Sequence, residues 1–547
     1  MSLPRDRHQG SLFQVSSLLE PLFEHKQRRR FGLFYEKVMP ALWAVREKLE
    51  RLYCQADGRP AINPVVLAGV TLLQFMEKAP DRQAAEQVAL NLGWKCALGL
   101  PLEYEGFHPT TLVVFRKRLV EGGLERAVFD AVVEVLQQAG LIKRRSKQRL
   151  DSTHIVGCVA QMGSVELVRE TLRLALEAIR RCGRDGTVPG WELLWERYCE
   201  GGVDWRRQNK AKLGKKLQQA GEDAHCILRW WEEQDSALPE GAQQQLELLQ
   251  RVFDERFEVD ADGVQQRRHP PSGAVQNPHD PEAQWACKDP KGKSAWVGYK
   301  AQLMETVPEE PRPKEKGEPT EEFLTEVSTT EAIASDMDGM ERALEAQEQQ
   351  GQWPPSELLV DAAYVTDDTL HEAQEAGTEL VGPARPSPQH QGVFPSERFD
   401  VDNANRKAIC PAGKASTQCS HISDAHKGAA YYRYEWGSQC DECPLRGQCT
   451  RAKSGRRILM VGIHHDLLQA RRRETETEAF QERMKQRNAI EGTISELKRG
   501  YGLGRARYKG LAKTRLANYF IGAACNVRRW LSRSLWEMEQ AAMAAMA

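Results

Sequence analysis

The spacing of hydrophobic residues divides the chain into segments of different structure. Over residues 1–145, apolar residues recur every three or four positions, as in PVVLAGVTLLQFMEKAPDRQAAEQVALNL and GGLERAVFDAVVEVLQQAGL. This period places them on one face of a helix. We therefore predict a helical N-terminal domain over 1–145. Its segment HPTTLVVFRKRL (108–119) would form a helix with Arg116 on a basic face. Such a domain is either a helix-turn-helix reader of DNA or an ordinary helical bundle with solvated arginines.

The middle of the chain alternates between strand and helix patterns. The segment QRLDSTHIVGCV (148–159) is short and β-branched, SAWVGYKAQLMETV (294–307) alternates apolar and polar residues, and EFLTEVST is a third strand candidate. A helical pattern, the buried run SELLVDAAY, a second helical pattern and the strand TELVGPA follow. This order predicts an α/β core with a mixed sheet and flanking helices, over 146–162 and 290–384.

Three further segments complete the predicted organisation. Residues 163–289 are charged and mainly helical, which indicates a helical insertion into the core. Residues 385–466 form a cysteine-bearing insertion with loop composition. Residues 467–547 comprise a long charged helix (about 467–500), a basic segment and a final amphipathic helix.

The composition is that of a globular protein. Of 547 residues, 41% are hydrophobic and 28% are charged. No run reaches the roughly 18 apolar residues that would span a membrane, and the N-terminus has no secretory signal. The 13 cysteines are odd in number and scattered, which indicates reduced thiols. We expect a cytoplasmic protein with no membrane partner.

The formal net charge of -1 conceals a basic stretch near the C-terminus. No acidic residue occurs between Lys498 and Trp530. The stretch contains several closely spaced cations, among them Lys498, Arg499, Arg505, Arg507 and Lys509. A local basic stripe of this kind is the electrostatic footprint of nucleic-acid binding.

Carboxylates stand at the predicted strands. Asp151 lies within the first strand, and Asp361 ends the apolar run LLV. A buried carboxylate is costly unless it is paired or bound to a metal, although each aspartate alone could also cap a strand or a helix. Glu491 is a third candidate, because Arg487, four residues before it, and Lys498, seven residues after it, share its helical face. Glu482 and Glu496 are the alternatives on the same helix.

The motifs together resemble those of a known family. The segment LVDAAY and the spacing R-x3-E-x6-K are similar to those of bacterial insertion-sequence transposases of the DDE class. HPTTLVVFRKRL, DPEAQWACKDPKGKSAWVGYKAQL and KRGYGLGRARYKGLAK resemble further parts of the same family. The resemblance implies a ribonuclease-H-like fold whose catalytic triad here is Asp151, Asp361 and Glu491. One departure is Met484, which stands where the family motif often has tyrosine; Tyr501 or Tyr508 could substitute for it.

The resemblance also implies a reaction and its partners. The triad would hold Mg²⁺ (or Mn²⁺), which suits hard oxygen ligands and in-line displacement at phosphorus. The implied activity is DNA cleavage at transposon ends followed by strand transfer into target DNA, by a homodimer on double-stranded DNA in a bacterial nucleoid. The DNA-contacting residues would be basic: Arg487, Lys498, Arg499, Arg505, Arg507, Lys509 and Arg116. The alternatives are a metal-dependent nuclease that cuts without joining and a DNA-binding protein descended from a transposase that has lost its chemistry.

Four cysteines in the 385–466 segment have the spacing of metal ligands. They are Cys410, Cys440, Cys443 and Cys449, with one C-x2-C pair. Four thiolates satisfy a tetrahedral structural zinc site, and Cys419 or His421 could replace one of them. Reduced free cysteines are the alternative.

Overall fold

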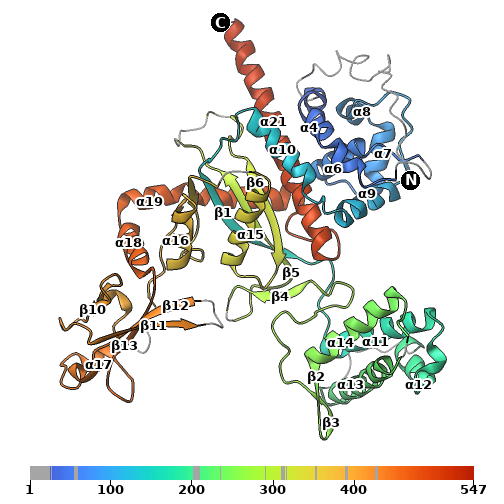
Figure 1. Ribbon diagram of the computed structural model, residues 1–547. Coiled ribbons are helices and arrows are strands. Elements are labelled where there is room, and N and C mark those ends of the chain that lie inside the picture. The colour runs from blue at the N-terminus through green and yellow to red at the C-terminus, as the bar shows by residue number, and fades with distance from the viewer. Residues whose placement is uncertain are drawn as a thin grey trace.

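The computed structural model describes residues 25, 28–54, 60–200, 210–234, 236–289, 291–309, 315, 317–351, 354–387, 392–424 and 429–546. A mixed sheet lies at the centre of the molecule, with the N-terminal helices beside the long C-terminal helix (Figure 1). The helical insertion and the cysteine-bearing segment project from different sides of the sheet (Figure 1). The first 24 residues of the predicted N-terminal domain lie outside the described part of the chain.

The central sheet has, within the described residues, six strands in the order β4-β5-β1-β7-β8, with β6 also paired to β5. Strand β1 is antiparallel to β5 and parallel to β7, and β7 is parallel to β8. The strands are β1 (Gln148–Val156), β4 (Gln284–Cys287), β5 (Ala295–Thr306), β6 (Leu324–Glu331), β7 (Glu357–Leu359) and β8 (Glu379–Val381). The prediction of an α/β core with a mixed sheet is confirmed.

Helices α15 (Asp336–Gln349) and α16 (Asp367–Glu375) pack on the sheet. Met340 of α15 and Leu370 of α16 are buried in one apolar cluster with Leu150 of β1 and Leu358 of β7. Serine and threonine caps fix where these helices begin: Ser335 and Thr366 each accept a hydrogen bond from a first-turn amide. The sheet is therefore covered by the helices that the sequence predicts between its strands.

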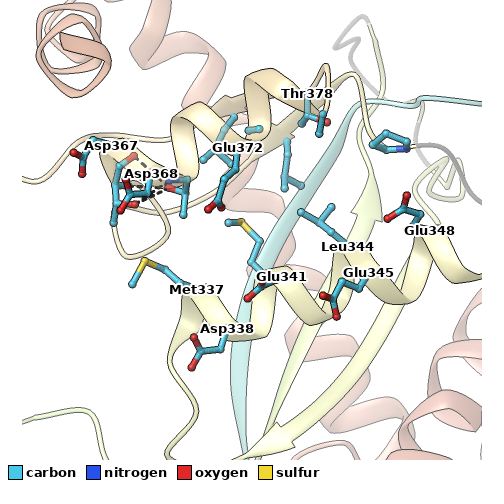
Figure 2. Close-up of a pocket in the computed structure, with 18 of the residues that line it drawn as sticks. Met337, Asp338, Glu341, Leu344, Glu345, Glu348, Asp367, Asp368, Glu372 and Thr378 are labelled. Carbon is cyan, nitrogen blue, oxygen red and sulfur yellow. Dashed lines mark hydrogen bonds between the residues drawn. The ribbon is translucent and has the colours of Figure 1, made fainter. Parts of the chain in front are cut away.

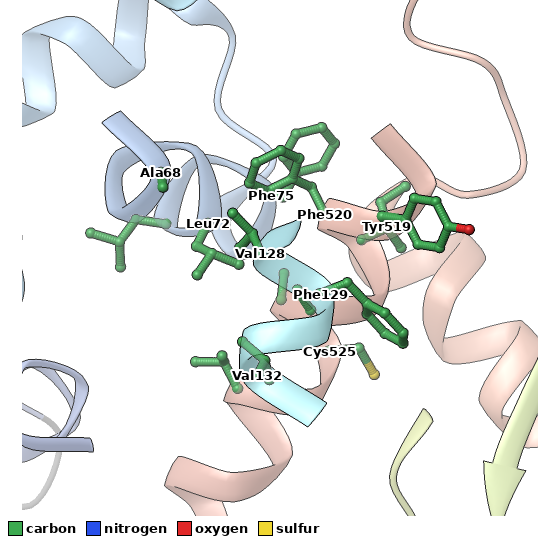
Figure 3. Packing of buried hydrophobic residues seen from close by; sticks show 14 of the residues in the cluster. Ala68, Leu72, Phe75, Val128, Phe129, Val132, Tyr519, Phe520 and Cys525 are labelled. Carbon is green, nitrogen blue, oxygen red and sulfur yellow. The ribbon is translucent and has the colours of Figure 1, made fainter. Parts of the chain in front are cut away.

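The N-terminal region is helical, as predicted. Its helices pack against α21 (Leu511–Met546) and share one continuous apolar core with it and with the sheet. Phe75 stacks on Phe520 at 5.7 Å between ring centroids, and Phe129 contacts Tyr519 (Figure 3). The helices are α3 (Arg29–Leu33), α4 (Met39–Ala44), α5 (Arg46–Glu50), α6 (Pro64–Glu77), α7 (Asp81–Leu90), α8 (Leu92–Leu98), α9 (Thr110–Glu121) and α10 (Ala127–Gln138).

The segment 163–289 has a separate apolar core, in which Leu176, Leu228 and Leu249 are buried. Its helices are α11 (Ser164–Arg181), α12 (Trp191–Trp195), α13 (Lys210–Glu232) and α14 (Glu240–Arg256), followed by the hairpin β2 (Phe257–Asp260) and β3 (Gly263–Gln266). The last part of this segment forms β4, which pairs with β5 in the central sheet. The insertion thus returns directly to the sheet edge.

The cysteine-bearing segment contains short antiparallel strands and little helix. They are β9 (Asp400–Asp402), β10 (Lys407–Ile409), β11 (Gln418–Asp424), β12 (Ala429–Glu435) and β13 (Ile458–Gly462), with the short helix α17 (Arg446–Cys449). Strands β11, β12 and β13 form one sheet and β9 pairs with β10. The chain then runs from β13 into the helices that lead to Glu491.

The long helix predicted over about 467–500 is wrong as a single element. The structure has α18 (His465–Thr475), α19 (Glu478–Lys485), a 3₁₀ turn (Arg487–Ala489), α20 (Ile490–Glu496) and a π-type turn (Leu497–Tyr501). Thr477 has extended backbone angles, and its side chain accepts from the amide of Phe480, so it caps a new helix. Gly502, with φ of 85°, then ends the run in a left-handed conformation that glycine adopts readily.

None of the helices in the described part of the chain is both long enough and apolar enough to cross a membrane.

Candidate functional site

The pairing of β1 with β7 brings two aspartates together from distant parts of the chain. The strands are parallel, with Gln148 opposite Leu358 and Arg149 opposite Leu359. Asp151 is three residues after Gln148, and Asp361 is three residues after Leu358. The register therefore places the two aspartates side by side. Asp151 is inside its strand, whereas Asp361 lies just beyond the end of β7. The site therefore forms at the carboxyl end of β7.

Arg487 joins the two carboxylates. Its Nη2 lies 2.8 Å from Oδ2 of Asp151 and 3.8 Å from Oδ2 of Asp361. The side chains of Arg487 and Asp151 are 13% and 16% exposed, whereas that of Asp361 is 41% exposed. Asp361 also accepts from the amide of Ala363 at 2.7 Å, which holds it in a tight turn. One cation thus lies within reach of both carboxylates.

A buried polar network holds the helix that carries Arg487 against β1. Arg149, two residues before Asp151 and on the same face of the strand, donates to the carbonyl of Gln486 at 2.9 Å. Arg149 is also paired with Glu305 of β5 at 2.6 Å. Glu305 in turn accepts from Thr493 of α20 at 2.8 Å and pairs with Arg529 of α21. Residues 486–493 are therefore anchored at both ends.

Burial and charge act in opposite directions on Asp151. Burial raises the pKa of Asp151 above its ordinary value, and the negative charge of Asp361 raises it further. The guanidinium of Arg487, the amide of Ser152 and the ammonium of Lys288 lower the pKa of Asp151. The two carboxylates are like charges in a partly dry site, so positive charge placed between them is favoured.

Glu491 lies one helical turn beyond Arg487, at the start of α20. It is exposed, and within the described part of the chain it makes no hydrogen bond or ion pair. The two alternatives are engaged: Glu496 is paired with Arg529 at 2.6 Å, and Glu482 with Lys485. Glu491 is therefore the carboxylate of the three that is free to take a ligand.

The carboxylates are not drawn together as closely as bound metal would hold them. Among the described residues, no group of three or more His, Cys, Asp or Glu side chains is arranged as a metal site. Asp151 and Asp361 are nevertheless both within 4 Å of one cationic nitrogen. Oxygen donors that already share a cation suit a hard divalent ion such as Mg²⁺.

A cleft of about 1010 Å³ opens beside the two aspartates. Asp151 and Asp361 line one side of it, and residues 269–274 of the insertion line another. Lys288, which follows β4, and the half-exposed Trp285 also face it. We did not predict from the sequence that residues 269–274 line the site. The turn-rich composition of the stretch before β4 can be recognised in the sequence. Its position at the cleft, however, depends on the pairing of β4 with β5.

The basic segment after α20 runs along the end of β1. The amide of Val156 donates to the carbonyl of Gly504 at 3.1 Å, and the amide of Ala506 donates to the carbonyl of Val156 at 2.8 Å. These bonds hold Arg505 at the strand end, where it is exposed. Lys509 and Arg499 are exposed as well. Three of the basic residues predicted to contact DNA are thus on the surface.

Lys498 is half-buried close to Lys288. Burial lowers the pKa of Lys498, and the positive charge of Lys288 lowers it further. Lys288 lines the cleft and also acts on Asp151, so it places positive charge on the side of the site that faces the cleft, with Lys498 close to it.

Arg116 is not on the surface where we predicted it. Its side chain is 7% exposed and is paired with Asp81, and it lies over the ring of Tyr508 at 5.0 Å. Arg507 joins the same cluster: it lies 3.7 Å from Asp81 and donates to the carbonyl of Ala79 at 2.7 Å. The charge of Arg116 is used within the protein, at the junction between the N-terminal helices and the basic segment.

The place of the family tyrosine is apolar in this protein. Met484 packs against a buried cluster that includes Leu359 and Phe480. Tyr501 is buried, and Tyr508 is covered by Arg116; their hydroxyls are buried without a hydrogen-bond partner in the described residues. Neither tyrosine is exposed, so neither is placed to substitute for the family tyrosine that Met484 replaces.

A second groove, of about 810 Å³, lies between α15 and α16. Figure 2 shows that carboxylates from both helices surround it; the labelled ones are Asp338, Glu341, Glu345, Glu348, Asp367, Asp368 and Glu372. A groove lined by negative charge repels the phosphate backbone of DNA. The cleft at Asp151 is therefore the candidate site for a nucleic acid. The four cysteines predicted as zinc ligands lie elsewhere, around one small void in the cysteine-bearing segment.

Two protein-family models match parts of the chain. Residues 22–118 match a transposase domain (DUF772), and residues 409–531 match a transposase DDE domain. The second match contains Arg487, Glu491 and Lys498, whereas Asp151 and Asp361 lie outside both. No curated protein and no solved structure matches the chain significantly.

Proposed function

Since this chain belongs to the insertion-sequence transposases of the DDE class, we propose that it cleaves DNA at the ends of its element and joins them to target DNA. A role in DNA transposition follows from the family. The observation that carries the catalytic assignment is the meeting of Asp151 and Asp361 across the parallel strands β1 and β7, around one cation.

The strand order supports a ribonuclease-H-like catalytic core. Three antiparallel strands (β6, β5 and β1) are followed by β7 and β8, which are parallel to β1. In this arrangement Asp151 is on the first strand, Asp361 follows the fourth, and Glu491 is on a helix that packs against β1. In the fold that the family resemblance implies, the first aspartate lies on the first strand, the second at the end of the fourth strand and the glutamate on a later helix, which corresponds to this arrangement when the short edge strand β4 is left out of the count.

Asp151, Asp361 and Glu491 would hold the divalent ions. When bound, Mg²⁺ or Mn²⁺ activates the attacking oxygen and stabilises the leaving oxygen in an in-line displacement at phosphorus. Burial raises the pKa of Asp151, so positive charge placed beside it stabilises its ionised form. Glu491 is exposed and unpaired, so it can turn toward the aspartates at little cost.

Arg487 has two roles in this proposal. Without metal its single positive charge offsets part of the negative charge of Asp151 and Asp361, which lie within 4 Å of its Nη2. Once its partners bind a divalent ion, the guanidinium is left free to bind a DNA phosphate in bidentate fashion. Lys288 adds a point charge at the cleft, and Lys498 adds a second one close to Lys288. These residues orient the scissile phosphate but exchange no proton with it.

The exposed cations of the basic segment extend the DNA-binding surface away from the carboxylates. Arg499, Arg505 and Lys509 are exposed, and Arg505 is fixed at the end of β1. Phosphate contacts from such residues position a duplex without reading its sequence. Since two transposon ends must be brought together for joining, we propose that the protein acts as a homodimer on DNA.

The test uses full-length protein, Mg²⁺, a DNA that carries the two ends of its element, and a target plasmid. We expect cleaved ends and joined products from the unmodified protein. Asp151→Asn and Asp361→Asn should each lower both products at least about a hundredfold, because even partners outside the ligand shell of a metal are worth about 10–100-fold. The control is Asp368→Asn, an exposed carboxylate in the acidic groove, which should change neither product.

The other outcomes decide between the alternatives. Cutting without joining would identify a nuclease, and binding without cutting would identify a protein that has lost its chemistry. Joining that survives Asp151→Asn would refute the triad proposed for this chain.

A further inference from the structure

The cysteine-bearing segment has very little apolar core for its size. Over the described residues between 392 and 462, six side chains form its buried cluster, among them Phe399, Tyr434 and Trp436. Its strands are short, and its two sheets are joined by long turns. A module with so small a core usually needs a cross-link or a metal ion to hold one conformation.

Four cysteines surround one void in this module. Cys410, Cys440, Cys443 and Cys449 line a cavity of about 20 Å³, which Trp436 closes on one side. A space of this size holds a single water-sized occupant. Cys440 and Cys443 share one turn, Cys449 ends α17 and Cys410 follows β10, so the fold brings Cys410 to the other three.

The backbone turns at three of the cysteines. The amide of Cys443 donates to the carbonyl of Cys440 at 3.3 Å, and the amide of Arg446 donates to the carbonyl of Cys443 at 3.0 Å. At the other side of the void, the amide of Gly413 donates to the carbonyl of Cys410 at 2.8 Å. Each of these two turns carries at least one cysteine that lines the cavity.

Basic side chains stand next to the void. Arg457 donates to the carbonyl of Cys449 at 3.0 Å, and Lys414 donates to the carbonyl of Gln439 at 2.8 Å. Arg446 also lines the cavity. Four thiolates around one Zn²⁺ carry a net charge of minus two, which nearby cations offset.

Two other potential ligands in the module are placed elsewhere. Cys419 and His421 lie on β11, and neither lines the void. Cys419 packs in the module core, opposite Tyr434 on the neighbouring strand. The structure thus separates four candidate ligands from two residues that the sequence alone could not distinguish from them.

We infer that Cys410, Cys440, Cys443 and Cys449 bind one structural zinc ion that holds the module together. All four cysteines are free thiols, and no three of them are yet drawn into a closed metal cluster in the described residues. Binding would therefore pull the sulfurs inward onto the ion by side-chain rotation, to Zn–S distances of about 2.3 Å. This inference does not depend on the proposed transposase activity.

The first experiment is metal analysis of the full-length protein, purified under reducing conditions with zinc in the growth medium and then dialysed. We expect one zinc ion per chain. Cys443→Ser, at a partly exposed position, should lose that zinc, and Cys419→Ser should keep it. Zinc near zero in the unmodified protein, or zinc that is unchanged in Cys443→Ser, would overturn the inference.

The second experiment reads the ligands directly. Replacement of zinc by Co²⁺ should give the intense sulfur-to-metal charge-transfer absorption of a tetrahedral thiolate site, and Cys443→Ser should weaken it. Cys419→Ser should leave the spectrum unchanged. If Cys443→Ser does not fold, Cys449→His, which keeps a zinc ligand of another type, should retain metal with an altered cobalt spectrum. Titration that finds two disulfides in place of four thiols in the module would exclude the site.

Discussion

The Nη2 atom of Arg487 lies 2.8 Å from Oδ2 of Asp151, although the two residues are on elements that are far apart in the sequence. The contact is made possible by Arg149, which anchors the carbonyl of Gln486 beside the same strand. Arg487 therefore competes with any metal ion for Asp151. In the proposed site, metal binding and DNA binding are therefore coupled through this one guanidinium.

Replacement of Arg487 should change how metal binding depends on pH. The guanidinium lowers the pKa of Asp151, so its loss in Arg487→Gln raises that pKa. Protons then compete with metal up to a higher pH, and the acid limb of Mn²⁺ binding should move upward by about one unit. The measurement is Mn²⁺ binding by electron paramagnetic resonance without DNA. Arg483→Gln is the matched control, because Arg483 is paired with Glu379 and Glu357 instead. If the acid limb of Mn²⁺ binding stayed at the same pH in Arg487→Gln, the proposed coupling between Arg487 and Asp151 would be contradicted.

Replacement of Glu491 should affect cleavage and not stability, whereas replacement of Glu496 should affect mainly stability. Glu491 is exposed and unpaired in the described structure, so Glu491→Gln should abolish cleavage while stability stays within roughly 0.5 kcal/mol. Glu496 holds the buried Arg529 at 2.6 Å, so Glu496→Gln should lower the melting temperature and leave cleavage measurable. Cleavage assays and thermal unfolding of both variants check this. Activity in Glu491→Gln together with loss in Glu496→Gln would exchange the two assignments.

Arg505 and Arg116 should affect DNA binding and stability separately. Arg505 is exposed at the end of β1. Its replacement in Arg505→Ala should weaken binding and reduce the slope of log K against log salt by about 0.9. Arg116 is buried against Asp81, and Arg116→Ala should leave the slope unchanged in folded protein but cost roughly 3 kcal/mol of stability. Binding isotherms at several salt concentrations and denaturant unfolding distinguish the two. A reduced slope in Arg116→Ala would show that we have misassigned it.

Glu326 should make stability depend on pH. It is fully buried beside Arg126, and burial raises the pKa of Glu326 to about 7. Its stabilising contribution is therefore greatest below the unfolded pKa, and it is lost as pH rises through the folded pKa. The free energy of unfolding of Glu326→Gln, relative to that of the unmodified protein, should therefore be higher at about pH 8 than at about pH 5. Denaturant unfolding at those two pH values measures this.

The control for Glu326 lies on the same strand. Burial acts to raise the pKa of Glu331, but a backbone hydrogen bond and the hydrogen bond and charge of Arg342 together lower it. Its contribution is present above the unfolded pKa and lost as pH falls, so Glu331→Gln should show the opposite trend in the acid range. If both variants followed the same trend, burial of Glu326 would not be the cause.

Much of the architecture could be predicted from local patterns. The helical period before residue 145 and the alternation in β5 are short-range features, and the structure has helices and strands there. Composition could not predict the break in the 467–500 helix. Thr477 caps a new helix only because the backbone there is extended, and packing against the rest of the protein decides that conformation. The motif around Asp361 and the spacing of Arg487, Glu491 and Lys498 likewise depend on neighbours in sequence.

The tertiary structure decided what each charge does. By itself the sequence determined the N-terminal helices, the main strands and helices of the core, and the identities of the candidate carboxylates, cations and thiols, but not the breaks in the 467–500 helix or the strands β9 to β13. Only the parallel register of β1 and β7 sets Asp151 beside Asp361, and only packing buries Arg116 while it leaves Arg505 exposed. The physical reason is that desolvation and pairing of a charge depend on contacts between residues far apart in the chain, which no local period encodes.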